Sequence, residues 1–210
     1  VARATGADAK TLRTLARAEA LDVMAKGAAV IARRLLDSGE LHGVTGLGGS
    51  QGTVAGTRVM ATLPFGLPKL MVSTMASGNT RPSVGTADIT ILSPVVDLSG
   101  GLNRFCRSAL DNAGHAIAGM ARGRQSIPSV PLGEEAAMTM FGSTTPCVTR
   151  VATRLREHGI EPVTFHANGV GGRALEDWLA DGEFSGVLDL TTTELADELV
   201  GGHRSAGPDR

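Results

Sequence analysis

Short apolar runs alternate with helical segments along this chain, and each run ends in a loop of small residues. The runs lie at 41–47, 69–75, 88–92, 136–142, 162–166 and 186–190. Helical spacing of apolar residues predicts helices at 8–37 (with one possible break), 51–61, 102–123, 144–159 and 173–180. Two-residue hairpin turns do not occur between the runs, so crossover connections must join the strands. The sequence therefore predicts an α/β fold with parallel sheets.

The regular alternation of apolar runs and helical segments is interrupted at 124–135, and this interruption divides the chain. Prolines without any helical or strand period make this stretch a linker. We expect a first α/β domain over 1–123, which carries the glycine-rich loop, and a second over 136–210. Three strands make a small sheet whose outer strands need neighbours, so we expect two Rossmann-like parallel-sheet domains, each incomplete, in a fragment of a longer polypeptide. The last ten residues predict no packed element.

Charge and composition exclude several classes of protein. A net charge of −1 argues against binding of nucleic acid, which requires a basic face, and an aromatic content of 3% removes base-stacking platforms. No apolar run reaches the ~20 residues needed to span a bilayer. The two cysteines match no metal or redox spacing, which favours a reducing compartment. We expect a cytoplasmic protein that binds neither nucleic acid nor membrane.

The predicted strands end in loops rich in glycine, serine and threonine. In open α/β sheets, ligands bind outside the carboxyl ends of the strands, and helix N-termini offer N–H groups and a positive dipole to an anion. The turn over 46–53 is the leading candidate for a phosphate site. The run 191–194 has capping-box spacing. The predicted phosphate-binding residues are Gly46, Gly48, Gly49, Ser50, Gln51, Gly52, Thr53, Ser73, Thr74, Ser77, Gly78, Asn168, Gly169, Gly171, Gly172, Thr191, Thr192 and Thr193.

The placement of acidic residues favours an anion site. Between Glu40 and Asp88 there is no aspartate or glutamate, and 136–156 and 162–175 lack them too, although the chain holds 21. A carboxylate ~4 Å from a phosphate would repel it by several kcal/mol at an effective dielectric near 20. Buried strands and tight turns exclude acids as well, so this simpler explanation stays open.

The turn departs from two well-known phosphate motifs. Gln51 stands where the dinucleotide fingerprint has its third glycine, and no acid lies ~20 residues further on to bind a ribose. No Gly-Lys-Ser or Gly-Lys-Thr string occurs, which excludes a Walker loop. Lys69 begins its strand, so we expect it at the end of the sheet opposite to the ligand.

Further polar residues admit two interpretations each. His166 ends a strand and is either a general acid or base, or a structural residue. Asp189 either holds Mg²⁺ through water or accepts hydrogen bonds from loop amides. Cys147 lies in the first turn of a helix, where a thiolate is stabilised, but a small buried residue is the more frequent case. Asp88 and Asp97 flank the third strand and are expected to be turn or cap residues.

Eight strings, in order over nearly the whole chain, resemble the Tm-one-like ATP-binding proteins, relatives of the tomato mosaic virus resistance protein. The strings are GLGGSQGT, PKLMVSTMASG, VGTADIT, VVDLSGGLNR, AIAGMA, MFGSTTPCV, FHANGVGGRALE and VLDLTTTELADELVGG. The resemblance implies a two-domain α/β architecture, ATP near the glycine-rich loops and a homodimer. Two residues depart from the family pattern. Pro94 disturbs the exit of the third strand, and Asn168 stands where the family usually has a threonine.

Three hypotheses follow for function. In the first, 46–53 wraps the phosphates of ATP, with Mg²⁺ possible, and 168–172 approaches from the second domain to form a cleft. In the second, the chain is an enzyme (a hydrolase, lyase or isomerase) that acts on a phosphorylated or carboxylated metabolite with His166 as acid or base. In the third, the nucleotide is structural and the chain is a protein-interaction module.

Overall fold

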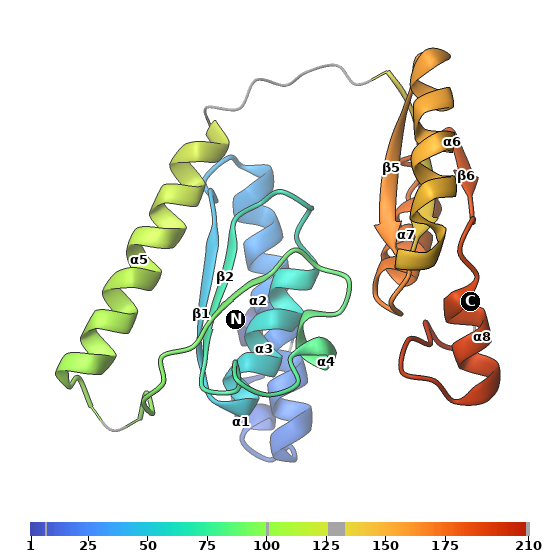
Figure 1. The fold of residues 1–210 in the computed structure, drawn as a ribbon. Coiled ribbons are helices and arrows are strands. Elements are labelled where there is room, and N and C mark those ends of the chain that lie inside the picture. Colours follow the sequence, from blue (N-terminus) through green and yellow to red (C-terminus); the bar gives the residue numbers. More distant parts are fainter. Residues whose placement is uncertain (7, 100, 126–132, 209–210) are drawn as a thin grey trace. The chain divides into compact units, whose positions relative to one another are not determined.

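The computed structural model describes residues 1–6, 8–99, 101–125 and 133–208, and the chain divides into two units, Val1–Pro128 and Ser129–Arg210. Each unit holds one three-stranded parallel sheet with helices, which confirms the predicted α/β class (Figure 1). Residues 126–132, the centre of the predicted linker 124–135, lie outside the described residues. Each unit is therefore described by itself.

Unit 1 is built around a sheet with the strand order β1-β2-β3. Its elements are η1 (Ala2–Thr5), α1 (Ala9–Leu12), α2 (Arg17–Asp37), β1 (Val44–Gly48), α3 (Ser50–Ala61), β2 (Lys69–Ser73), α4 (Arg81–Val84), β3 (Thr90–Leu92) and α5 (Arg104–Gln125). The expected break in the first long helix is confirmed at 13–16. Every residue of the central strand β2 is buried, as a strand covered on both faces requires. No helix in the described part of the chain is long and apolar enough to cross a membrane.

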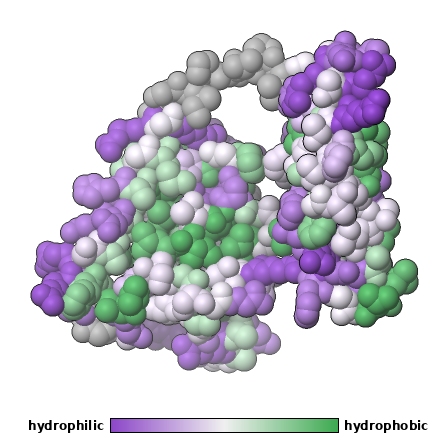
Figure 2. Space-filling view, in the orientation of Figure 1, coloured by the Kyte–Doolittle hydropathy of each residue, from purple (hydrophilic) through white to green (hydrophobic). Residues whose placement is uncertain are grey.

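Helices cover both faces of this sheet. On one face, α3 packs on β1 and β2, and α2 packs on α3; α5 lies on the other face, against β2 (Figure 1). Leu70 and Val72 of β2 form the core beneath Ala113 of α5. Leu47 of β1 pairs with Val72 and therefore shares the α5 face, yet it is 55% exposed. Figure 2 shows apolar residues gathered over unit 1 between α5 and α3.

Unit 2 also holds a three-stranded parallel sheet, but its first strand is the central one, and the strand order is β5-β4-β6. Its elements are β4 (Glu134–Met140), η2 (Gly142–Thr144), α6 (Thr145–Glu157), β5 (Ile160–His166), α7 (Gly171–Ala180), β6 (Gly186–Leu188) and α8 (Thr193–Val200). Both α6 and α7 pack on β4 and β5. Phe165, Trp178 and Phe184 form an aromatic cluster with ring centroids 5.5–6.1 Å apart. The six predicted strands are therefore all present.

The last ten residues form no helix or strand where they are described, as expected, but two of them are held by contacts with unit 2. The carboxylate of Asp197 accepts the backbone N–H of Arg204 at 2.8 Å. Ala206 is buried, and its carbonyl oxygen accepts a hydrogen bond from the guanidinium of Arg173. The sequence could not predict these contacts because they are made by side chains of α7 and α8, which no local pattern in the tail reveals.

Candidate functional site

The turn between β1 and α3 is made of glycines that leave no room for side chains. A Cβ atom on Gly48 would lie 2.6 Å from the Cα of Gly52, and one on Gly52 would lie 3.2 Å from the carbonyl oxygen of Leu47. Because both contacts are with backbone atoms, a larger residue would push the strand and helix apart. Gly49 is the N-cap of α3. The glycines thus let the backbone pass from strand to helix at close range.

The first turn of α3 has N–H groups that the helix itself does not use. An α-helix leaves its first N–H groups without intrahelical acceptors, and its dipole places partial positive charge there. The N–H of Thr53 bonds to the carbonyl of Gly49 at 2.8 Å, but no side chain caps α3 in the described part of the chain. Ser50 and Gln51 are exposed. The turn therefore offers backbone donors to an external anion.

The end of β2 lies beside this turn. The hydroxyl oxygens of Thr53 and Ser73 are 2.6 Å apart, and that of Ser73 accepts the N–H of Met75 at 3.0 Å. Thr74 donates its N–H to the carbonyl of Gly48 at 3.2 Å. Thr53 and Ser73 are only 2% and 0% exposed, so these two predicted ligands tie the loops together from the inside. Thr74 is half-buried and nearer to solvent.

Three other predicted residues of unit 1 lie around the turn. Gly46 packs against the side chain of Met71, since a Cβ atom there would lie 2.6 Å from the methionine sulfur. Ser77 and Gly78 are exposed, and Gly78 donates its N–H to the carbonyl of Met75 at 3.0 Å. Gly46 thus serves packing, whereas Ser77 and Gly78 stay accessible.

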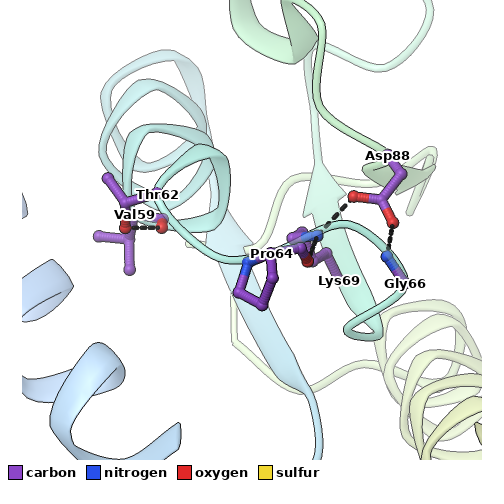
Figure 3. A network of polar contacts seen from close by, with 6 residues as sticks. All are labelled: Val59, Thr62, Pro64, Gly66, Lys69 and Asp88. Atoms are coloured by element: carbon purple, nitrogen blue, oxygen red, sulfur yellow. Dashed lines mark hydrogen bonds and ion pairs between the residues drawn. The ribbon is translucent and has the colours of Figure 1, made fainter. Parts of the chain in front are cut away.

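Lys69 lies at the amino end of β2, opposite to the turn, which confirms its predicted place. Its ammonium donates to the carbonyl of Pro64 at 2.8 Å and pairs with the carboxylate of Asp88 (Figure 3). The other oxygen of Asp88 accepts the N–H of Gly66 at 2.8 Å. The side chain of Lys69 is fully buried, so its charge is neutralised inside the fold and does not serve a phosphate.

The chain leaves β3 irregularly, as expected from Pro94. β3 ends at Leu92, Pro94 is buried, and Val95 adopts a φ of 64°, a backbone conformation rare for a β-branched residue. Asp97 then accepts hydrogen bonds from the hydroxyl and the N–H of Ser99, both at 2.6 Å. These bonds hold the pKa of Asp97 below its usual value, the hydroxyl contributing most. Asp97 is confirmed as a turn residue.

The loop 168–172 of unit 2 already holds a carboxylate of the chain itself. Oε1 of Glu194 accepts the N–H groups of Gly169 at 2.5 Å and Gly172 at 3.1 Å. Oδ1 of Asn168 accepts the two N–H groups between them at 3.2 and 3.3 Å. Glu194 is 1% exposed. Four successive N–H groups therefore have internal acceptors, unlike those at the start of α3.

Sequence reasoning missed this role of Glu194. Its capping-box spacing predicted a bond within its own helix, but Thr192 is the N-cap of α8 and makes no side-chain cap. No acidic residue occurs at 162–175 in the sequence, as expected. In the folded chain, however, the carboxylate of Glu194 lies against this loop. Glu194 comes from 25 and 22 positions away to fill the loop. The only feature of the sequence that pointed to this role was a glutamate that follows several threonines after the end of a predicted strand.

A chain of threonine hydroxyls lies at the carboxyl end of β4. Thr191 is buried, donates its N–H to the hydroxyl of Thr139 at 3.0 Å and has its own hydroxyl 2.6 Å from that of Thr144. The hydroxyl of Thr144 in turn accepts the N–H of Phe141 at 3.1 Å and lies 3.0 Å from its carbonyl oxygen. Thr191, a predicted phosphate ligand, thus orders the neighbouring loop.

The predicted metal ligand Asp189 takes part in the same network. Its Oδ1 accepts the hydroxyl of Thr139 at 2.5 Å. Within the described residues, no group of three or more His, Cys, Asp and Glu could hold a metal ion. Thr192 is exposed and Thr193 half-buried at the start of α8. A hydrogen-bonding role for Asp189 is therefore visible, and the magnesium role stays a prediction.

His166 ends β5 and is exposed. Its ring lies 5.3 Å from that of Phe141, tilted by 31°. The loop after it returns so closely that a Cβ atom on Gly171 would lie 2.0 Å from the carbonyl oxygen of His166. Cys147, for which burial was the favoured expectation, is exposed. That expectation was wrong because the adjacent Val148 is the residue of α6 that is buried.

Comparison with models of known protein families assigns the chain to a family. The model of the N-terminal domain of the Uncharacterised protein family (UPF0261) matches residues 1–126, and that of the C-terminal domain matches residues 134–210. The chain belongs to the UPF0261 family. The match covers both units.

Individual relatives agree with the family match. A UPF0261 protein of Clostridium tetani is 46% identical over 196 residues, which cover 92% of this chain and 48% of that protein. A UPF0261 protein of Mesorhizobium japonicum is 47% identical over 189 residues, 90% of this chain and 46% of its own length. The ToMV resistance protein Tm-1(GCR237) of Solanum lycopersicum is 44% identical over 199 residues, 92% of this chain and 26% of its own. The chain thus spans about half the length of the bacterial relatives.

Proposed function

We propose that this UPF0261 chain binds a nucleotide through its phosphates at the β1–α3 turn. The observation that carries the proposal is the N-terminus of α3, whose N-cap residue is Gly49 and which has no side-chain cap among the described residues. Glycine-lined turns at helix N-termini suit phosphate because the N–H groups and the helix dipole both favour negative charge. The resemblance to Tm-one-like proteins favours ATP as the nucleotide.

The proposal rests on unit 1 because the corresponding loop of unit 2 is filled. There Glu194 already accepts two N–H groups, so these backbone donors are not available to an external anion. At the β1–α3 turn the sequence has no acid anywhere from 41 to 87. Of these two loops of similar composition, only the first leaves its backbone N–H groups to an external anion.

The chemistry of the turn assigns roles to its residues. The N–H groups of Ser50, Gln51 and Gly52 would bond to phosphate oxygens, and the exposed hydroxyl of Ser50 would add a donor. Thr53 and Ser73 would hold the two loops in register from beneath. Mg²⁺ would arrive with the phosphates and keep several waters, since this ion binds readily to nucleotides with few protein ligands.

The substitution Gln51→Glu tests the proposal because stability and binding should move in opposite directions. A carboxylate in the first turn favours the helix dipole, by about 0.3–1 kcal/mol. The same charge would repel the phosphates, and we expect the Kd for ATP to rise by about tenfold or more. Isothermal titration calorimetry measures the Kd, and urea unfolding followed by circular dichroism measures stability.

Thr149→Glu is the matched control, since it adds the same charge at an exposed position of α6. We expect its Kd for ATP to equal that of the wild type. Adenosine should bind much more weakly than ATP if the phosphates supply the main contacts. Equal affinity for adenosine and ATP, or an unchanged Kd in Gln51→Glu, would rule out the phosphate-centred site.

A further inference from the structure

The backbone of Phe141 is hydrogen-bonded at the carboxyl edge of the sheet of unit 2. It follows β4 directly, and both of its backbone polar groups contact the hydroxyl of Thr144, at 3.1 and 3.0 Å. Thr144 is itself fixed by the buried hydroxyl of Thr191 at 2.6 Å. Ligands of open parallel sheets bind at this edge. Phe141 therefore lies at the edge of the sheet where a ligand is expected.

The C-terminal tail brings Arg204 over this ring. Its guanidinium carbon lies 4.7 Å from the ring centroid of Phe141. The tail is anchored on both sides, because Asp197 accepts the backbone N–H of Arg204 at 2.8 Å and Ala206 is buried. Gly202 packs so tightly on Asp197 that a Cβ atom there would lie 2.3 Å from the carboxyl carbon.

The guanidinium and a second donor remain open on this platform. Arg204 is exposed and forms no ion pair of 4.0 Å or less with any described residue. His166 is exposed as well, and its ring lies 5.3 Å from Phe141. No imidazole hydrogen bond joins it to another residue in the part of the chain described. A forked cation and an imidazole thus contact the same aromatic ring.

The acids of this edge are engaged elsewhere. Asp189 accepts the hydroxyl of Thr139, and Glu194 accepts loop N–H groups. Asp197 holds the backbone of the tail, and Glu198 accepts the hydroxyl of Ser205. Each of these carboxylates therefore has a donor other than the guanidinium of Arg204.

We propose that Phe141, His166 and Arg204 form a second ligand site, independent of the β1–α3 turn, that binds the oxyanion of a small molecule, a carboxylate or a phosphate. Arg204 presents the planar fork of N–H donors that fits either group, and stacking on Phe141 limits its orientations. His166 adds a donor from the neighbouring strand. Phe141 gives the rest of the ligand an apolar surface to contact.

The histidine ring signals report directly on this site. Proton–carbon NMR spectra resolve the five histidines, and His166→Gln identifies the signal of His166. We titrate the whole chain at fixed pH with sodium phosphate, with sodium acetate and with sodium chloride. We expect the His166 signal to shift saturably with phosphate or acetate, at millimolar Kd, and not with chloride. The stronger of the two anions identifies the ligand group.

Arg204→Gln removes the charge but keeps the backbone bond to Asp197, so the tail stays anchored. We expect it to weaken the anion response by about tenfold. Arg150→Gln, at an exposed position of α6, should leave the response unchanged. Gln51→Glu should also leave it unchanged, which separates this site from the nucleotide site. A response that is absent, equal with chloride, or undiminished in Arg204→Gln would overturn the proposal.

Discussion

At the scale of single residues, two buried charges organise the loops of this protein. Glu194 binds the loop that follows β5, and Lys69 with Asp88 binds the loops at the amino end of the first sheet. Both arrangements are internal, so they contribute to stability and leave ligand binding to other residues. Substitution of these residues should lower the stability of the unit to which each belongs.

Glu194→Ala should destabilise unit 2 strongly. It leaves the N–H groups of Gly169 and Gly172 buried without their acceptor, and each such loss costs about 1–3 kcal/mol. We expect the free energy of unfolding to fall by about 3 kcal/mol, and by less in Glu194→Gln, which keeps an acceptor oxygen. Urea unfolding followed by the fluorescence of Trp178, the only tryptophan, measures it. The exposed Glu183→Ala serves as control, and a loss equal to that control would contradict the assigned role.

Substitution of Lys69 and substitution of Asp88 should lower the stability of the protein by different amounts. The side chain of Lys69 is 0% exposed and that of Asp88 is 26% exposed. Asp88→Asn would leave a buried ammonium without its counter-ion, at a cost of about 3–5 kcal/mol. Lys69→Met removes the buried charge and leaves a carboxylate that water reaches, so we expect a smaller loss. Unfolding of both variants by circular dichroism compares them, and an equal or reversed order would refute this asymmetry.

At the scale of elements, the β1–α3 turn depends on the close approach of a strand and a helix. Gly48→Ala would place a methyl carbon 2.6 Å from the Cα of Gly52. We expect unit 1 to lose about 1–3 kcal/mol of stability and the affinity for ATP to fall, because overpacking displaces the backbone donors. Urea unfolding and calorimetric titration measure the two effects.

Gly114→Ala in α5 is the matched control for that substitution. A Cβ atom there meets no other atom within 4 Å, so the change only removes the flexibility of a helical glycine. We expect a gain of about 0.4–1 kcal/mol. A loss of stability in Gly48→Ala together with a gain in Gly114→Ala would support the packing argument. Destabilisation of similar size in both variants would contradict it.

At the scale of the whole molecule, each unit has its own sheet and its own core. Trp178 lies in α7, so its fluorescence follows the unfolding of unit 2, while helical circular dichroism follows both units. We expect Asp88→Asn to lower the circular-dichroism midpoint and leave the fluorescence midpoint in place. If both midpoints shift together, the two units unfold as one.

Much of the fold was predictable from local pattern. The six apolar runs form the six strands, and the glycine turn begins a helix one residue before its predicted start at 51, because periodicity and glycine placement act over a few neighbouring residues. The same local signals predicted loops of equal character at 46–53 and 168–172. They could not show that one of these loops contains a carboxylate.

Periodicity and the placement of glycines are sufficient to predict the parallel sheets and the position of the candidate turn, and eight short strings carry the family resemblance, since each depends on residues that are close in sequence. The role of Glu194, the pairing of Lys69 with Asp88 and the contact of Arg204 with Phe141 arise only after folding. In each case a single side chain reaches a partner far along the chain. Such contacts have no period, and their energies depend on burial and on satisfied hydrogen bonds, which the packed structure alone creates.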